Sequence, residues 1–275
     1  MSKLELVIVI LNWNGYDDSR RCLESVYQSQ RVSFRVVLVD NGSSDDSVNR
    51  LKVQFPGLEI IALPENIGYA AGNNVGLRRA QQLFPEAVLL LNNDTVLAAD
   101  CLRQMLDCAR SRQRIGAVVP KIYYLNDPKV LWYAGGGIQW WRVSVSQDGF
   151  RQEDDGQWDE PCLSQFATGC ALLLKSVAVE NVGLLDEDFY SYFEDLDYSL
   201  RLQSEGYEIQ YCPHARLWHR VGAGTRGREY SPYYLYYQTR NRIRAFVRYR
   251  KKLYSVYAHL VNILLYFLLR ILTIL

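Results

Sequence analysis

Two amides and a carboxylate end an apolar run in the stretch LLLNNDT, residues 89–95, and these side chains could bind a metal ion. Carboxylate and carbonyl oxygens are the ligands that hard ions such as Mg²⁺ prefer. A tight turn would account for the same residues, because Asn and Asp hydrogen-bond their own backbone and tolerate left-handed conformations. The stretch alone leaves two interpretations open, a turn and a metal site that contains Asp94.

A second acidic group lies in YFEDLDYSLRLQSEG, which places Glu194, Asp195 and Asp197 in the first turn of a predicted helix. Acids at this end complement the helix dipole, by about 0.3–1 kcal/mol each. Three carboxylates in four positions exceed what the dipole needs, and their mutual repulsion would raise the pKa of one of them. A carboxyl group of raised pKa beside a pocket is what general-base catalysis requires. The pattern therefore favours catalysis over helix stabilisation alone.

One of the three histidines, His219, ends a predicted strand and follows Asp195 in the chain. A lone histidine is usually a satisfied core or surface residue. The next stretch, RVGAGTRGR, is glycine-rich and basic, which suits a loop that closes on phosphates. His219 is therefore a candidate site residue beside this loop.

Short apolar runs alternate with helical patterns through the first 120 residues. The apolar runs predict strands over 4–13, 34–41, 58–66 and 87–94, and the periodic stretches after them predict helices over 17–30, 45–55, 73–84 and 98–112. Continuous Val, Ile and Leu strands separated by helices indicate a parallel sheet covered on both faces. We therefore expect an α/β protein.

Polar residues follow all four predicted strands, where a parallel sheet binds its ligands. They are Asn12 and Asn14, then Asp40, then Asn66, then Asn92 to Asp94. Turn chemistry explains any single case, but Asp40 and Asp94 at one rim favour a binding site.

The rest of the chain is less uniform. Residues 121–165 predict short strands and glycine turns, with Trp140 available for packing or for stacking on a sugar ring. Beyond them, we expect a buried strand over 166–175, a short helix and turn over 176–189, a helix over 193–206 and a strand over 207–220.

Composition and charge restrict the function. Hydrophobic content of 49% and charged content of 22% describe an ordered globular protein. Residues 1–225 hold 21 Lys and Arg against 29 Asp and Glu, whereas 226–252 hold nine against one, so an anionic partner is expected near the C-terminus. A nicotinamide-dependent dehydrogenase is excluded, because NWNGYDDSRR after the first strand has only Gly15 where that class needs GxGxxG.

Cysteine usage and the N-terminus indicate a location in the cytoplasm. The six cysteines show no CxxC and no metal-ligand spacing, so we expect mostly buried thiols in a reducing compartment. The stretch MSKLELVIVIL is expected to be a first strand and not a signal peptide.

The apolar tail, residues 253–275, would span about 34 Å as a helix, which is enough to cross a bilayer. Its polar residues form one helical stripe: Ser255, His259, Asn262, Tyr266, Arg270 and Thr273. An in-plane membrane helix or an oligomer helix has a use for such a stripe. The preceding basic segment, RNRIRAFVRYRKK, suits anionic headgroups. Nucleic acid is a competing partner for this segment, but no other part of the sequence indicates recognition of a nucleic-acid base. We expect 226–275 to attach the protein peripherally to the inner face of the cell membrane, with a homo-oligomer interface as the alternative.

The chain resembles family 2 glycosyltransferases with a GT-A fold, closest to the rhamnosyltransferase and galactofuranosyltransferase-like branch. The resemblance covers about residues 4–225, with one further stretch beyond them. The matching stretches are VIVILNWNG, VVLVDNGSSDDS, PENIGYAAGNNVGL, LLLNNDT, FATGCALLLK, GLLDEDFYSYFEDLDYSLRL, GYEIQYCPHARLWH and YYLYYQTRN. It implies a mostly parallel central sheet flanked by helices in a transferase domain, 1–225, and a C-terminal amphipathic helical extension, 226–275.

The resemblance also implies a nucleoside-diphosphate sugar donor, dTDP-rhamnose or a UDP-sugar. Asp40 would hold the nucleotide base or ribose, and the glycines of NIGYAAGNN would allow close backbone approach. The implied donor site contains Leu11, Asn12, Asp40, Asn66, Gly68, Asn73, Asn93 and Arg226.

NND occupies the position of the family's DxD motif. Asp94 would therefore bind a Mg²⁺ or Mn²⁺ ion that bridges the donor diphosphate, with His219 as a second ligand. This sequence departs from the motif at Asn92, which removes one anionic ligand. An amide still offers a carbonyl oxygen, and a hard ion can keep waters instead.

By the same resemblance, Asp195 would be the base that deprotonates the acceptor hydroxyl in a single inverting displacement. Asp186 would lie in the region that faces the acceptor, a glycan or lipid-linked molecule of cell-surface polysaccharide synthesis, and Glu194 and Trp140 are further candidates for contact with this acceptor. The alternative is a degenerate transferase that binds nucleotide or scaffolds a membrane complex without turnover. Asn92 favours that alternative, whereas the intact Glu194, Asp195 and His219 oppose it.

Overall fold

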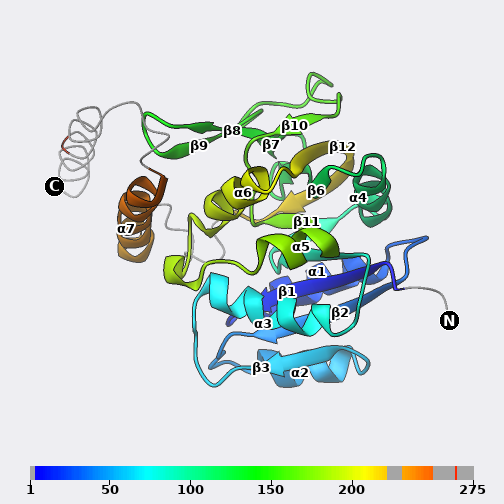
Figure 1. Cartoon of the computed structure of the whole chain (residues 1–275). Helices are drawn as coiled ribbons and strands as arrows, with labels where there is room; N and C mark the ends of the chain where they lie inside the picture. The colour runs from blue at the N-terminus through cyan, green and yellow to red at the C-terminus, as the bar shows by residue number, and fades with distance from the viewer. Residues whose placement is uncertain (1–3, 222–230, 250–263, 265–275) are drawn as a thin grey trace.

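The structure is a computed structural model that describes residues 4–221, 231–249 and 264. Its centre is a ten-stranded mixed sheet in the order β10-β12-β6-β11-β4-β1-β2-β3, with β5 paired to β12 and β7 paired to β6 (Figure 1). The strands of this sheet are β1 (Leu6–Asn12), β2 (Phe34–Asp40), β3 (Glu59–Ala62), β4 (Ala87–Asn92), β5 (Thr95–Leu97), β6 (Ile115–Tyr124), β7 (Leu131–Tyr133), β10 (Cys162–Ser164), β11 (Ala171–Lys175) and β12 (Glu208–His219). A separate hairpin consists of β8 (Gly136–Gln139) and β9 (Ser144–Gln147).

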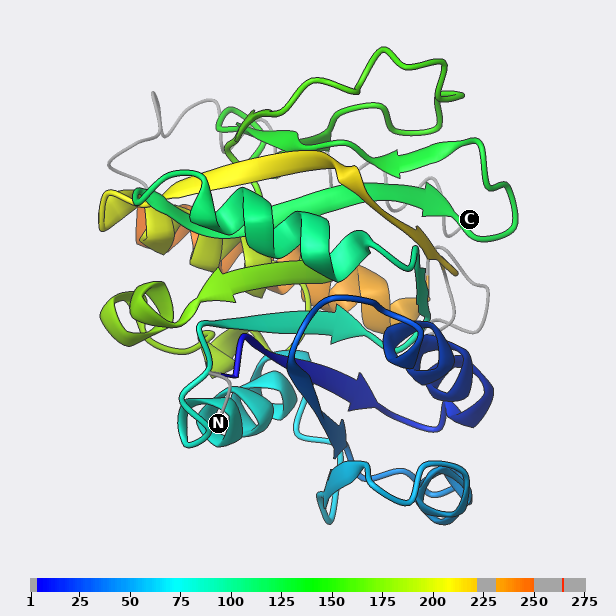
Figure 2. The ribbon, with the colours of Figure 1, turned by 90° about the vertical axis from the view of Figure 1, so that its right-hand side faces the viewer.

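Helices cover both faces of the sheet, as the sequence pattern predicts. The helices are α1 (Tyr16–Tyr27), α2 (Ser47–Gln54), α3 (Tyr69–Gln81), α4 (Cys101–Arg110), α5 (Ser176–Val182), α6 (Glu194–Ser204) and α7 (Pro232–Tyr249), with a 3₁₀ turn at Glu187–Phe189. In the two views, α1 and α4 lie on one face, and α3, α5 and α6 lie on the other (Figures 1 and 2).

The four strands expected in the first half of the chain are confirmed, and β3, β2, β1 and β4 run parallel. Most apolar residues of β1, β2 and β4 are buried because helices cover both faces, which is why these runs are apolar, whereas the edge strand β3 is only partly buried. β11 then enters antiparallel between β4 and β6. The helix expected from residue 73 instead begins at Tyr69, since Gly68 at φ +94 turns the chain directly before it.

One long strand, β6, was not expected, because its second half was assigned to the irregular middle of the chain. Pro120 lacks the N–H that a sheet interior needs, and Lys121 is charged. The neighbouring β12 bulges between Cys212 and Arg216, opposite these two residues. Lys121 is 1% exposed, and its ammonium lies 2.9 Å from Asp154. A bulge and a distant carboxylate thus permit a strand that local sequence disfavours.

The C-terminal helix α7 packs against the loop and helix around residues 186–197. Asp197, whose side chain is fully buried, accepts hydrogen bonds from Arg201 of its own helix, at 2.8 Å, and from Arg248 and Tyr249 of α7, at 2.7 and 2.6 Å. This carboxylate therefore anchors α7 to α6. The division at residue 225 stays a prediction.

Among the residues that the structure describes, no helix is long and apolar enough to cross a membrane. The polar stripe expected in 253–275 and the basic residues of 222–230 lie outside the described residues. The expected membrane or oligomer role of this tail therefore stays a prediction.

Candidate functional site

Polar side chains meet at the carboxyl ends of β1, β2 and β4, as the rim of a parallel sheet predicts. Asn12 ends β1 and lies opposite Asp40, which ends β2. The Asn12 amide donates to Asp40 at 2.7 Å and accepts from Ser19 at 2.7 Å, and Asn93 donates to the same Ser19 hydroxyl at 2.9 Å. Three strand ends are thus joined by one hydrogen-bond network.

Asp40 is almost entirely enclosed by this network, with 2% of its surface exposed. One carboxylate oxygen accepts from Ser43 N at 3.0 Å, and the other accepts from the Ser43 hydroxyl at 2.6 Å. The carboxylate therefore shapes the turn after β2, and ligand contact would come from the groups that this turn presents. Its donor-binding role stays a prediction.

The turn at residues 66–68 lies beside that loop. Asn66 accepts from Gly68 N at 2.9 Å and from the Asn41 amide at 3.1 Å. A Cβ atom at Gly68 would lie 2.6 Å from the Tyr190 ring, so glycine is required here by space as well as by its φ of +94. Asn73 is 1% exposed and donates back to Tyr69 O in its own helix at 2.9 Å.

Leu11 lies beside these residues and is half-buried. A Cβ atom at Gly72 of α3 would lie 2.7 Å from the Leu11 side chain, so helix and strand approach closely at this point. The donor-side roles of Leu11, Asn66, Gly68 and Asn73 stay predictions.

Asp94 and His219 are brought together by the pairing of β5 with β12. Thr95 lies opposite His219 in this antiparallel pair, and Arg220 N donates to Asp94 O at 2.8 Å. His219 Nε2 and Asp94 Oδ1 are 3.2 Å apart. The Trp132 indole stands edge-on to the imidazole, with ring centroids 4.7 Å apart, and fixes its orientation.

This pair has the chemistry and spacing of two metal ligands. Two neighbouring ligands of an octahedral ion, each at about 2.1 Å, lie about 3.0 Å apart, which is close to the 3.2 Å observed. Within the described residues, Asp94 Oδ1 and His219 Nδ1 are buried without a well-aligned hydrogen bond. Among the described residues, no group of three or more His, Cys, Asp or Glu side chains could hold a metal ion. The two residues present fit a divalent ion that would need further ligands from outside these side chains.

The two amides before Asp94 are used differently. Asn92 Oδ1 lies 3.2 Å from the Tyr69 hydroxyl, and the Asn93 amide donates to the Ser19 hydroxyl at 2.9 Å. Asp94 is therefore the residue of NND that contacts His219.

Asp195 lies in the first turn of α6 and is partly buried. Its carboxylate accepts hydrogen bonds from Gly169 N at 3.2 Å and Leu196 N at 2.9 Å. Burial raises the pKa of Asp195 to about 6, against the lowering effect of these backbone donors. A carboxyl group that is ionised near neutral pH, yet is more basic than an ordinary aspartate, suits proton abstraction.

The other two acids of the motif have separate environments. Glu194 is 5% exposed, and its Oε2 has no hydrogen-bond partner in the described part of the chain. Burial, together with the charge of Asp195, raises the pKa of Glu194 well above its ordinary value. Asp197 is the structural anchor of α7 described above. Of the three acids, Glu194 and Asp195 therefore remain as candidates for chemistry.

Tyr69 links the Asp94 side to the Asp195 side, and sequence reasoning missed it. Its hydroxyl lies 3.2 Å from Asn92 Oδ1 and donates to Gly169 O at 2.7 Å, while Gly169 N donates to Asp195. Burial, followed by the charges of nearby carboxylates, raises the pKa of Tyr69 well above its ordinary value, so this hydroxyl is a donor. The matched stretches contain Tyr69 and Gly169, but no local signal marks either as a site residue.

Two expected acceptor residues make structural contacts, and one expected donor residue lies outside the described residues. Asp186 pairs with Arg248 of α7 at 2.5 Å and caps the 3₁₀ turn through Asp188 N. Trp140 follows β8 and packs, partly buried, against the core. Arg226 lies outside the described residues. Acceptor contact by Asp186 and Trp140 stays a prediction.

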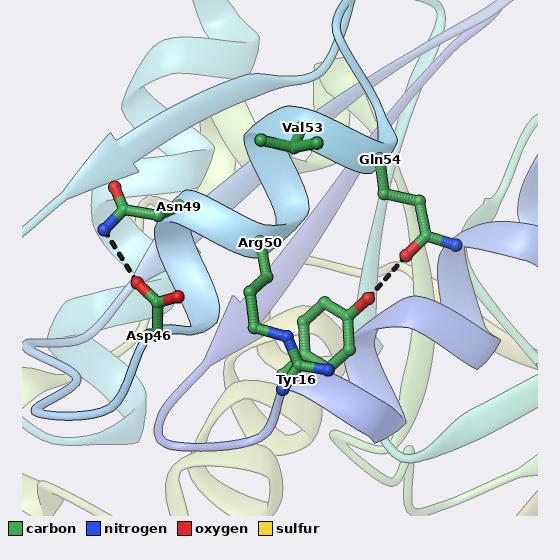
Figure 3. Close-up of a pocket in the computed structure, with 6 residues that line it drawn as sticks. All are labelled: Tyr16, Asp46, Asn49, Arg50, Val53 and Gln54. Carbon is green, nitrogen blue, oxygen red and sulfur yellow. Dashed lines mark hydrogen bonds between the residues drawn. The ribbon is translucent and has the colours of Figure 1, made fainter.

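A surface hollow of about 330 Å³ lies between α1 and α2 (Figure 3). The Arg50 guanidinium covers the Tyr16 ring, 3.5 Å from its centroid, and the Tyr16 hydroxyl donates to Gln54 at 2.6 Å. These side chains bind one another, and the hollow contains neither the Asp94–His219 pair nor Asp195.

Comparison with known proteins decides the family. Residues 7–179 match the sequence profile of the family described as Glycosyl transferase family 2. The chain belongs to glycosyl transferase family 2. It is a glycosyltransferase of the GT-A type, as the resemblance implied.

Two curated relatives support this assignment. An N-acetylglucosaminyl-diphospho-decaprenol L-rhamnosyltransferase of Mycobacterium tuberculosis is 25% identical over 242 residues, which cover 80% of this chain and 77% of that protein. The low-salt glycan biosynthesis hexosyltransferase Agl10 of Haloferax volcanii is 25% identical over 251 residues, which cover 88% of this chain and 75% of that protein.

Solved structures share the fold. A structure of GalNAc-T7 with UDP, GalNAc and Mn²⁺ has a TM-score of 0.65 at 17% identity. The mannosyltransferase PcManGT of Pyrobaculum calidifontis, in complex with GDP-Man and Mn²⁺, has a TM-score of 0.57 at 17% identity. The similarity covers 79% and 80% of this chain, but only 44% and 58% of those chains.

Proposed function

We propose that this glycosyltransferase moves a sugar from a nucleoside-diphosphate donor, dTDP-rhamnose or a UDP-sugar, to a hydroxyl of a glycan or lipid-linked acceptor. The observation that carries the proposal is the connected pair of sites, Asp94 with His219 on one side and Asp195 on the other. Gly169 N donates to Asp195, and the Tyr69 hydroxyl donates to Gly169 O and lies 3.2 Å from Oδ1 of Asn92, two residues before Asp94. The rhamnosyltransferase relative supports the choice of donor, and its name supports a lipid-linked acceptor.

The proposed mechanism is a single inverting displacement. Asp195 takes the proton from the acceptor hydroxyl as its oxygen attacks the anomeric carbon, and the bond to the diphosphate breaks on the opposite side. Asp94 and His219 would hold a Mg²⁺ or Mn²⁺ ion, and Mn²⁺ is present in both structural neighbours named above. When bound, such an ion offsets negative charge on the leaving diphosphate.

Calorimetric titration of UDP, dTDP and GDP, each with and without Mg²⁺ or Mn²⁺, tests the proposed donor site. Metal-dependent binding of one diphosphate would support it and identify the base. If none of the three binds to folded protein, the donor site is refuted, and the degenerate scaffold that Asn92 favours becomes the better account.

The pH dependence of transfer follows from the environment of Asp195. Because burial raises its pKa to about 6, kcat/KM should rise as pH increases through that value and fall about tenfold per unit below it. Asp195 affects the free energy of unfolding in the opposite direction. Because its pKa is raised in the folded protein, it stabilises the protein at low pH, and this stabilisation is lost as pH rises through about 6. A pH–rate profile checks the expected change in kcat/KM, and a kcat/KM that stays constant across this range would contradict it.

We also propose that the C-terminal region attaches the protein to an anionic membrane surface. The structure limits which residues of α7 are available, because Arg240, Arg244 and Arg248 bind the body of the protein. Exposed apolar side chains of α7, Tyr236, Ile243 and Val247, are available for contact with lipid. Co-sedimentation should therefore be stronger with vesicles that contain anionic lipid than with neutral vesicles, and equal binding to both would contradict the charge-based part of the proposal.

A further inference from the structure

The backbone directly before Glu194 and Asp195 is held in an unfavourable conformation. Tyr190, Tyr192 and Phe193 have φ of 64, 66 and 74, although none of them is glycine. Ser191 N donates to Phe189 O at 2.7 Å, which closes a γ-turn centred on Tyr190. A γ-turn with positive φ is rare and strained, and such residues persist only where surrounding contacts enforce them.

A single side chain of α7 supplies three of these contacts. Asn241 is fully buried, and its amide nitrogen lies 2.8 Å from Phe189 O, 2.8 Å from Ser191 O and 2.7 Å from Tyr192 O. An amide nitrogen carries two hydrogens, so these three carbonyl oxygens share them. Asn241 therefore satisfies three of the backbone acceptors that the strained segment exposes.

Contacts from other elements fix the rest of the segment. Tyr190 O accepts from Ala70 N at 3.1 Å, at the start of α3. The Tyr190 ring stacks on Tyr237 of α7, with centroids 5.0 Å apart and planes 11° apart. The Arg240 guanidinium donates to Phe189 O at 2.8 Å. Residues 189–193 are thus held between the 66–70 turn and α7. They are followed directly by Glu194 and Asp195, the first residues of α6.

We propose that Asn241 is a positioning residue for the transfer reaction: its amide holds the backbone of 189–193 in the conformation that places Asp195. The inference rests on the proposed role of Asp195 as the base. It means that α7, which follows the part of the chain matched to the family profile, completes the geometry of the site.

Two variants test this role against a control on the same helix. Asn241→Ala removes the amide, and Asn241→Leu keeps a similar branched shape but offers the carbonyls no hydrogen. Thr239→Ala is the control, because in the described part of the chain the Thr239 hydroxyl donates within α7, to Leu235 O at 2.7 Å. Each variant is compared with wild type in kcat, acceptor KM, donor Kd and amide hydrogen exchange of 189–196.

Both Asn241 variants should lose at least about tenfold in kcat, since small misplacement of a catalytic group is costly, while donor Kd stays within about twofold. Exchange should become faster in 189–196 and remain unchanged in β1 and β4. The acid limb of their pH–rate profiles should also move, because Asp195 would sit in a different environment. Thr239→Ala should behave as wild type.

Unchanged kcat and exchange in both variants would overturn the proposal. So would a loss of kcat that accompanies faster exchange throughout the sheet, because that result indicates general destabilisation. If Asn241→Ala does not fold, the similarly shaped Asn241→Leu carries the test. If wild type shows no transfer, the proposed function fails, and local exchange still decides whether Asn241 holds this segment.

Discussion

Replacing Asp195 with Asn is expected to lower the rate of sugar transfer by about 10²–10⁴-fold, the usual contribution of a side-chain base. The amide keeps the shape of the side chain, and its oxygen can still accept from Leu196 N, as the carboxylate does at 2.9 Å. It cannot take a proton from the acceptor hydroxyl at neutral pH. The loss should therefore appear in kcat, with donor affinity unchanged.

Glu205→Gln is the matched control for this variant. Glu205 follows the last turn of α6 and is exposed, so neutralising it removes one negative charge from the same helix without touching Asp195. Its kcat should equal that of wild type. Steady-state kinetics and calorimetry of the donor diphosphate provide the measurements. If Asp195→Asn retains more than about a tenth of the wild-type kcat, Asp195 is not the base.

The strands and the polar rim could be predicted because their signals are local. β1, β2 and β4 are buried on both faces, so their sequences are continuously apolar, and the abrupt change to Asn12, Asp40 and Asn92 marks their ends. β6 could not be predicted in the same way. Its Lys121 is compensated by Asp154, 33 residues later, which no local pattern reveals.

The connections within the site were equally invisible to local patterns. Tyr69 and Gly169 are 100 residues apart, and their hydrogen bond exists only once α3 and β11 pack together. The approach of His219 to Asp94 depends on the pairing of β12 with β5, a strand of three residues. The resemblance to a family supplied both residue roles, and the structure supplies the distance between the two side chains.

The C-terminal segment illustrates a limit of charge counting. Its excess of arginine indicated an anionic partner outside the protein. In the described part of this segment, Arg248 instead pairs with Asp186 and Asp197, and Arg240 binds backbone carbonyls. Arginine side chains can thus find anionic or polar partners within the fold, in buried carboxylates and in the carbonyl groups of strained loops. Net charge along a sequence does not distinguish such internal partners from a membrane.

Replacing Asp94 with Asn is expected to abolish the metal-dependent part of donor binding and to lower transfer by at least about 10²-fold, since loss even of a residue that supports a metal ligand typically costs 10–100-fold. Asn92 already replaces one acid of the motif, so Asp94 is the last carboxylate of NND. His219, 3.2 Å away, would then face a neutral amide, and a hard divalent ion would lose its anionic protein ligand at this pair.

Calorimetry with Mn²⁺ present and absent separates this effect from general damage. In wild type, Mn²⁺ should tighten binding of the cognate diphosphate, and in Asp94→Asn the two affinities should become equal while metal-free binding is retained. Asp100→Asn, at the exposed start of α4, controls for loss of an acid near β5 and should keep the wild-type difference. A full metal effect in Asp94→Asn would place the ion elsewhere and leave the Asp94–His219 contact as a structural ion pair. Retention of transfer with loss of the metal effect would instead show that the charge on the leaving diphosphate is offset by the protein's own cations.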